Sequence, residues 1–250
     1  MGVTKKSFGK SPEGKDVFLY ELKNENGVAA SVTDFGAILV SVMVPDKNKK
    51  LTDVVLGYDT VEGYYENKPH FGSPIGRNGN RIGGAKFIIN GKEYVLAQND
   101  NKNNLHSGPD FYRTRVWDVE EVKEQENSIT FRIFSPDGDQ GFPGNFTGYV
   151  TYKLTDDNEL VMHYTGSADA DTVVNMTNHS YFNLAGHNAG AESMLNHVVQ
   201  IHAPEFTPVS DSEAIPTGEI LKVEGTPMDF TSPKKIGQDV EADYEQLIFG

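Results

Sequence analysis

The chain has 250 residues, a formal net charge of −14 and no cysteine. Binding to nucleic-acid phosphates needs clustered Lys and Arg, so this charge argues against a nucleic-acid partner. The lack of cysteine excludes disulfides and thiolate metal sites. No apolar run approaches the length of a membrane span, and residues 1–10 lack the apolar core of a signal peptide. We therefore expect a cytoplasmic protein that does not associate with membranes.

Segments rich in β-branched and aromatic residues follow one another along the chain and predict strands. They are DVFLYEL (16–22), AILVSVMV (37–44), SITFRIF (128–134), GYVTYKL (148–154) and ELVMHYT (159–165). Residues 86–96 predict a hairpin with Asn90 and Gly91 at its tip, where both residues must accept positive φ. TDDN at 155–158 predicts a second tight turn, and the best helical candidate is a short turn at 60–66. The pattern predicts an all-β fold, with residues 1–250 in one antiparallel β-sandwich domain.

The last residues form an apolar segment that we expect to be strand-like. Leu247, Ile248 and Phe249 stand together next to the final Gly250. An unpaired apolar edge promotes association. The segment therefore predicts that further chain, or another segment, completes the sheet.

A glycine-rich loop, FGSPIGRNGNRIGGAKF at 71–87, has no phosphate-binding spacing. It presents Arg77 and Arg81 around Asn78 and Asn80. An Arg and an Asn on a tight loop can hydrogen-bond neutral hydroxyls. An arginine paired with a surface carboxylate explains the same pattern, and the loop alone does not decide between them.

Two further polar loops are ambiguous. His106 lies in NDNKNNLHSGPDFY (99–112), where a lone histidine is more often without function. Asp137 and Asp139 have a spacing suggestive of calcium, but the rest of an EF-hand loop is missing, so 135–145 reads as a turn-rich connection. The histidines of the chain show no metal-binding spacing.

His179 lies in NMTNHSYFNLAG, residues 175–186. If this segment is extended, His179, Tyr181 and Asn183 share one face, and Asn178, Ser180 and Phe182 share the other. Imidazole exchanges protons near neutrality, and an aromatic ring packs on the apolar face of a sugar. The pair of His179 and Tyr181 therefore suits a ring-shaped polar ligand.

Several motifs in register resemble the aldose 1-epimerase (galactose mutarotase) family. They are GRNGNRI, NLHSGPDF, DGDQGFPGN, VTYKLTDDNEL, NMTNHSYFNLAG, FTPVSDSEAIPTGEI and GTPMDF, and the resemblance extends from about residue 10 to the end. It implies a large galactose mutarotase-like β-sandwich (a supersandwich), no metal or cofactor, and interconversion of the α and β anomers of aldohexoses such as galactose and glucose.

The resemblance also implies roles for individual residues. His179 would be the general acid that protonates the ring oxygen, and His106 would hydrogen-bond the sugar near the same centre. Asn80 and Arg81 would hold hydroxyls, and Tyr181 would line the pocket.

In this family the general base is a glutamate near the C-terminus, and a sugar-binding aspartate follows a Gly-Tyr. Both positions would lie past Gly250, and neither Glu241 nor Glu245 matches the base motif. We therefore expect the sandwich to be incomplete at its C-terminal side, and the 250-residue chain to have little or no activity by itself.

Two other functions remain open. The first is a sugar-binding or regulatory module that keeps the pocket without the chemistry. The second is a glycoside-processing enzyme, which needs two carboxylates at the scissile bond, and no such pair stands out.

Overall fold

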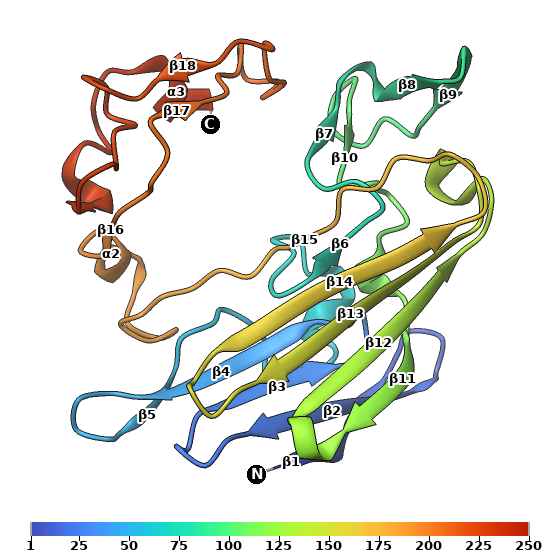
Figure 1. The fold of residues 1–250 in the computed structure, drawn as a ribbon, viewed down its shortest axis with the longest axis vertical. Coiled ribbons are helices and arrows are strands. Elements are labelled where there is room, and N and C mark those ends of the chain that lie inside the picture. Colours follow the sequence, from blue (N-terminus) through green and yellow to red (C-terminus); the bar gives the residue numbers. More distant parts are fainter. Residues whose placement is uncertain (1, 250) are drawn as a thin grey trace.

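The computed structural model describes residues 2–249 and contains two antiparallel sheets packed face to face (Figure 1). The first sheet has five strands in sequential order: β1 (Gly2–Lys10), β2 (Asp16–Lys23), β3 (Ala29–Thr33), β4 (Leu39–Pro45) and β5 (Leu51–Asp53). The second has four, also in sequential order: β11 (Asp118–Lys123), β12 (Ser128–Ser135), β13 (Phe146–Leu154) and β14 (Leu160–Ala168). Most neighbouring strands in the two sheets are joined by short connections, which favours antiparallel pairing.

The space between the sheets is the main hydrophobic core. Side chains of β2, β3 and β4 meet those of β12 and β13 there, with Leu22, Phe131 and Val150 fully buried. Along β13 every second residue is buried, from Phe146 to Leu154, because one face of the strand packs on the opposite sheet. The Tyr152 hydroxyl donates to the carbonyl of Ala37 at 2.7 Å, so a polar group in the core is satisfied across the two sheets. These contacts confirm the predicted β-sandwich.

Smaller paired elements extend from the ends of the sheets. The short strands are β6 (Pro74–Ile75), β7 (Arg81–Ile82), β8 (Lys86–Ile89), β9 (Lys92–Val95), β10 (Asn104–Leu105), β15 (Thr177–Asn178), β16 (Val198–Val199), β17 (Glu205–Phe206), β18 (Leu221–Lys222) and β19 (Lys234–Lys235). The helices are α1 (Gly63–Glu66), α2 (Ala191–Met194) and α3 (Glu245–Phe249), with 3₁₀ turns η1 (Gly83–Ala85), η2 (Tyr112–Thr114), η3 (Glu124–Glu126), η4 (Asp139–Gly141) and η5 (Ile236–Gln238). None of the helices in residues 2–249 is long and apolar enough to cross a bilayer.

The predicted hairpin and most predicted strands are confirmed. β8 and β9 pair across Asn90 and Gly91, which have φ of 52° and 78°. The strand predicted at 37–44 begins later, at Leu39, because Gly36 and Ala37 adopt positive φ in a turn.

The prediction for the end of the chain is wrong. Residues 245–249 form the helix α3 rather than a strand. In this helix Leu247 is half-buried and Ile248 is exposed. The apolar run by itself cannot distinguish a strand from a helical turn.

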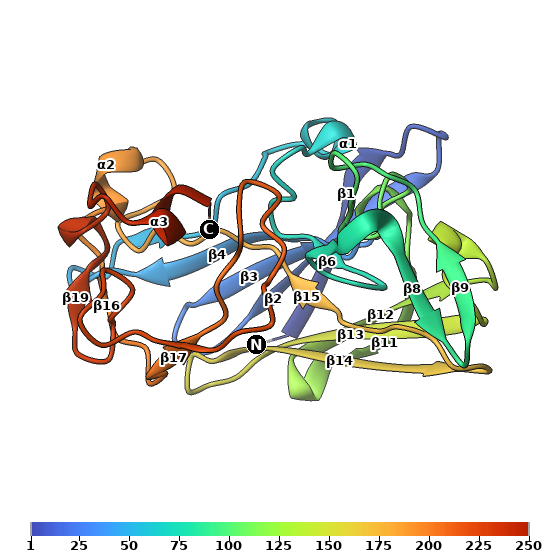
Figure 2. The ribbon, with the colours of Figure 1, turned by 90° about the horizontal axis from the view of Figure 1, so that it is seen from above.

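The last quarter of the chain packs less densely than the sandwich. From β16 onward, Pro208 and Val223 are the buried residues within the described range. In both views this part lies on the opposite side of the molecule from the β8–β9 hairpin (Figures 1 and 2). The segment that leads to it, 175–187, crosses between the two and pairs with β6 through β15.

Gly72 joins this crossing segment to the first sheet. Its carbonyl accepts hydrogen bonds from the Leu39 amide at 2.9 Å and from Asn178 Nδ2 at 3.1 Å. Its φ is +66°, and a Cβ at this position would lie 1.9 Å from the Leu39 carbonyl oxygen. Only glycine therefore fits this junction.

We expect Gly72→Ala to lower the free energy of unfolding by about 3 kcal/mol or more, because left-handed strain adds to a backbone collision. Urea denaturation measures the change. The matched control is Gly91→Ala, whose Cβ would meet nothing within 4 Å, so it should cost only about 1–2 kcal/mol. Equal losses in the two variants would contradict the role of Gly72.

Candidate active site

An open pocket of about 870 Å³ lies where three loops converge. The loops follow β6, β10 and β15. All five residues proposed from the sequence line this pocket: Asn80, Arg81, His106, His179 and Tyr181. Segments distant in the sequence are therefore brought to one place by two short pairings, β6 with β15 and β7 with β10.

The glycine-rich loop is anchored by Arg77, which is fully buried. Its guanidinium donates to the carbonyls of Ser135, Pro136, Pro143 and Gly144 at 2.8–3.1 Å. The expectation that Arg77 presents its side chain to hydroxyls of a ligand is wrong, because these carbonyls already occupy its donors. Asp139, in the turn-rich connection, instead pairs with Arg115 at 2.7 Å.

Asn80 and His106 hold each other through two hydrogen bonds. The Asn80 amide donates to His106 Nδ1 at 2.9 Å, and the His106 amide donates to the Asn80 carbonyl at 3.1 Å. Both residues have positive φ, 65° and 56°. Since Nδ1 accepts a hydrogen bond, the proton of neutral His106 is on Nε2, where it can be donated to a ligand.

The pKa of His106 is lowered to about 4. Burial is the main cause, followed by the positive charges that His179 and Arg81 can bear, and Asp100 opposes the shift. His106 is therefore neutral near pH 7 and serves as a hydrogen-bond donor through Nε2.

Arg81 is held in place by a carboxylate that the sequence did not single out. Its Nε donates to Asp100 Oδ2 at 2.6 Å, and both side chains are three-quarters buried. The terminal amino groups of Arg81 make no hydrogen bond within residues 2–249. The sequence left open whether an arginine of this loop pairs with a carboxylate or binds hydroxyls. Arg81 pairs with Asp100 through Nε and still presents its terminal amino groups as donors.

His179 follows β15 directly, and its amide donates to the Ser73 carbonyl at 2.9 Å. Neither ring nitrogen makes a hydrogen bond within residues 2–249, so both can meet a ligand. The rings of His179 and Tyr181 are 5.3 Å apart, as expected from a shared face. Asn183 does not share that face: it is buried and donates to Ser193 Oγ. The strand is only two residues long, because Asn178 Oδ1 accepts from the Ser180 amide and closes a turn.

A third histidine, His70, completes a cluster that sequence reasoning missed. Its ring centroid lies 5.1 Å from that of His106 and 5.6 Å from that of His179, while the latter two are 5.2 Å apart. His70 precedes the glycine-rich loop in a plain-looking KPHF segment. No spacing rule points to it, because its placement depends on a positive φ of 57°.

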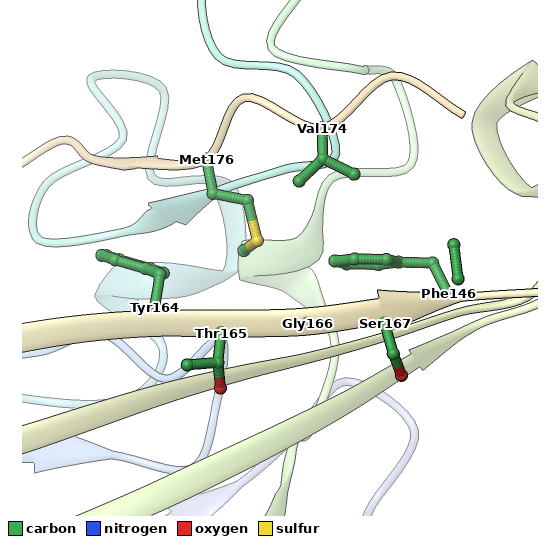
Figure 3. A pocket seen from close by; sticks show the side chains of 8 residues that line it. Phe146, Tyr164, Thr165, Gly166, Ser167, Val174 and Met176 are labelled. Carbon is green, nitrogen blue, oxygen red and sulfur yellow. The ribbon is translucent and has the colours of Figure 1, made fainter. Parts of the chain in front are cut away.

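A smaller hollow of about 290 Å³ lies beside β14 and is mostly apolar. Phe146, Tyr164, Val174 and Met176 project into it, whereas Thr165 and Ser167 point to the other face of the strand (Figure 3). Met176 also lines the histidine pocket. The hollow has no charged lining residue, so the chemistry of this region belongs to the histidine pocket.

No Asp or Glu lines the histidine pocket within residues 2–249. In that range, no group of three or more His, Asp or Glu is disposed to hold a metal ion. The pocket thus combines imidazoles, an arginine, amides and a tyrosine.

A model of the aldose 1-epimerase family matches residues 19–248. The chain belongs to the aldose 1-epimerase family. Galactose mutarotase from Bos taurus is 38% identical over 242 residues, which cover 96% of this chain and 68% of that protein. Aldose 1-epimerase from Escherichia coli (strain K12) is 36% identical over 236 residues, which cover 94% of this chain and 66% of that protein.

Solved structures of family members agree. Galactose 1-epimerase from Lactobacillus acidophilus NCFM superposes with a TM-score of 0.87 at 25% identity, covering 99% of this chain and 70% of that one. An aldose epimerase homologue from C. elegans superposes with a TM-score of 0.81 at 34% identity, covering 88% of this chain and 66% of that one. The chain thus spans about two thirds of the length of these epimerases.

We expect Arg77→Met to lower the free energy of unfolding by about 3 kcal/mol or more, because several buried carbonyls lose their donor. Chemical denaturation measures the loss. Lys10→Met is the control: it removes an exposed ion pair with Asp16, and such pairs contribute about 1 kcal/mol at most. A loss in Arg77→Met no larger than in the control would overturn the anchoring role.

Acid should destabilise the folded chain through His106. Its pKa is about 4 in the folded state and about 6.5 when unfolded. The unfolded chain therefore binds more protons between these values, so the stability that His106 provides is present above pH 6.5 and lost as pH falls toward 4. The slope is up to about 1.4 kcal/mol per pH unit.

The measurement is the unfolding free energy from pH 4 to 7 in the wild type and in His106→Asn, where the slope should flatten. A comparison of variants is needed because burial raises the pKa of Asp34 to about 6, which acts in the opposite direction. His163→Asn, on an exposed site of β14, should keep the wild-type slope. An unchanged slope in His106→Asn would refute the assignment.

Proposed function

We propose that the histidine pocket binds an aldohexose and that His179 donates a proton to its ring oxygen, as the acid of an aldose 1-epimerase. One observation supports this assignment most directly. His106 and His179 are 5.2 Å apart in an open pocket, and they have different hydrogen-bonding capacities. His106 presents only an Nε2–H donor, while His179 has both ring nitrogens free.

The reaction of the family interconverts the α and β anomers of an aldose. Opening the ring needs removal of a proton from the anomeric hydroxyl and delivery of one to the ring oxygen. The C1–C2 bond then rotates, and the ring closes on the other face of the carbonyl. A histidine can give and recover this proton at neutral pH, and a positioned acid contributes about 10²–10⁴-fold.

The other groups suit recognition of a neutral sugar. The terminal amino groups of Arg81 and the side-chain amide of Asn80 can donate to hydroxyls, and His106 Nε2–H can donate near the anomeric centre. The ring of Tyr181, which is 44% exposed, can pack on the apolar C–H face of the sugar. We also place the protein in the cytoplasm, as expected from the sequence.

A second function is a sugar-binding module. The pocket lining described above includes no Asp or Glu, so the group that would take the anomeric proton is not among those residues. The same observation argues against a glycosidase, which needs two carboxylates. Binding without chemistry is therefore the alternative that must be tested.

Polarimetry of freshly dissolved α-D-galactose, combined with a binding titration, separates the two functions. We expect the chain to bind the sugar and to accelerate relaxation only weakly, because no carboxylate lines the pocket, and His179→Asn should abolish the acceleration. His202→Asn, an exposed residue outside the pocket, is the control. Binding with no acceleration at all would favour the module, and absence of binding would exclude both functions.

A further inference from the structure

His70 is held against the two pocket histidines by a hydrogen-bonded turn. Asn67 Oδ1 accepts from the Phe71 amide at 3.0 Å, and Asn67 Nδ2 donates to the Phe71 carbonyl at 3.1 Å. The His70 amide donates to the Asn67 carbonyl at 2.8 Å, and its own carbonyl accepts from the Ser73 amide at 3.1 Å. These hydrogen bonds hold the turn on both sides of His70, so the direction of its side chain is set by the fold.

The ring of His70 is held in one tautomer by Arg113. Arg113 Nε donates to His70 Nδ1 at 3.1 Å, so neutral His70 carries its proton on Nε2. Arg113 is 6% exposed and has no carboxylate partner within residues 2–249. Its guanidinium lies over the ring of Phe111 at 4.7 Å, and Phe111 also packs edge-on against His70 at 4.9 Å. A buried cation without an anion is costly. Arg113 Nη1 has no hydrogen-bond partner within residues 2–249, and the hydrogen bond from Nε to His70 offsets only part of this cost.

The groups around His70 also keep it uncharged. Burial lowers the pKa of His70 to about 3, and the positive charges of Arg113, His106 and His179 act in the same direction. These three are the charged or titratable groups that face it, from η2, from the loop after β10 and from the segment after β15. A neutral His70 places no positive charge beside the ring of His179.

We propose that His70, locked as its Nε2–H tautomer by Arg113, is a positioning residue that orients the imidazoles of His106 and His179 toward the sugar. The proposal rests on the function proposed above only for the identity of the ligand. The structural claim is that the rings of His106 and His179 depend on His70 for their orientation. Arg113 affects them only because it holds the His70 ring.

Histidine-selective NMR of the whole 250-residue chain tests the lock directly. Long-range ¹H–¹⁵N spectra should show His70 as the Nε2–H form from neutral pH down to about pH 4. Arg113→Met removes the charge and should raise the titration midpoint of His70 part of the way toward the ordinary value, because burial remains the larger cause of the shift. Arg113→Lys keeps the charge and should leave the midpoint low. A His70 that titrates near pH 6.5 in the wild type, or is unaffected in Arg113→Met, would overturn the lock.

The second arm asks whether His70 orients its neighbours. His70→Phe keeps a ring but loses the acceptor for Arg113, and His70→Asn keeps an acceptor and tolerates positive φ but loses the ring. Both should shift the imidazole signals of His106 and His179 and weaken D-galactose binding by about 5–10-fold, the usual size of a lost positioning contact. His163→Asn should change neither.

The two proposals fail differently. If the wild-type chain does not bind D-galactose, the proposed function fails. The positioning role of His70 is then still tested by the NMR signals of the His106 and His179 imidazoles in the His70 variants. If His70→Asn folds, leaves those signals in place and binds the sugar as the wild type does, the positioning role is wrong.

Discussion

The buried guanidinium of Arg77 is the constraint on which the site depends. It ties the glycine-rich loop to the connection between β12 and β13 through four carbonyls. With Arg77 inside, the next residues are held by the loop after β10: the Asn78 amide donates to Ser107 Oγ, and the Asn80 amide donates to His106 Nδ1. A buried charge has to be fully hydrogen-bonded, and that requirement permits few arrangements of the loop. The pocket geometry is therefore a consequence of satisfying one buried cation.

The electrostatics of the pocket follow from burial and from two further arginines. Burial is the main cause that lowers the pKa of His106 and of His70, and the nearby charges of Arg81 and Arg113 add to it. Neutral imidazoles with fixed tautomers are hydrogen-bond donors, which match the neutral hydroxyls of a sugar. Only His179 keeps both ring nitrogens free among the three. The cluster thus separates donors that hold a ligand from the one residue suited to move a proton.

A strand could be predicted from the sequence when apolar and polar residues alternate clearly along it. β12 and β13 face a core on one side, so their patterns were readable and were predicted within two residues. β1 and β11 were missed, because exposed polar residues occupy both of their faces. β3 was missed for a different reason: its five residues are all buried, and so short a run shows no period. At the C-terminus, an apolar run predicted a strand and the structure has a helix.

The sequence by itself determined the fold class, the family resemblance and five of the residues around the pocket. These depend on local composition, on strand alternation and on motifs, all of which can be read along the chain. Tertiary structure alone decided that Arg77 is an anchor, that Asp100 holds Arg81, and that His70 and Arg113 stand behind the two predicted histidines. Those roles arise from contacts between residues up to 95 positions apart and from positive φ in short loops. Burial, which sets the charge of each imidazole, exists only once the loops have come together.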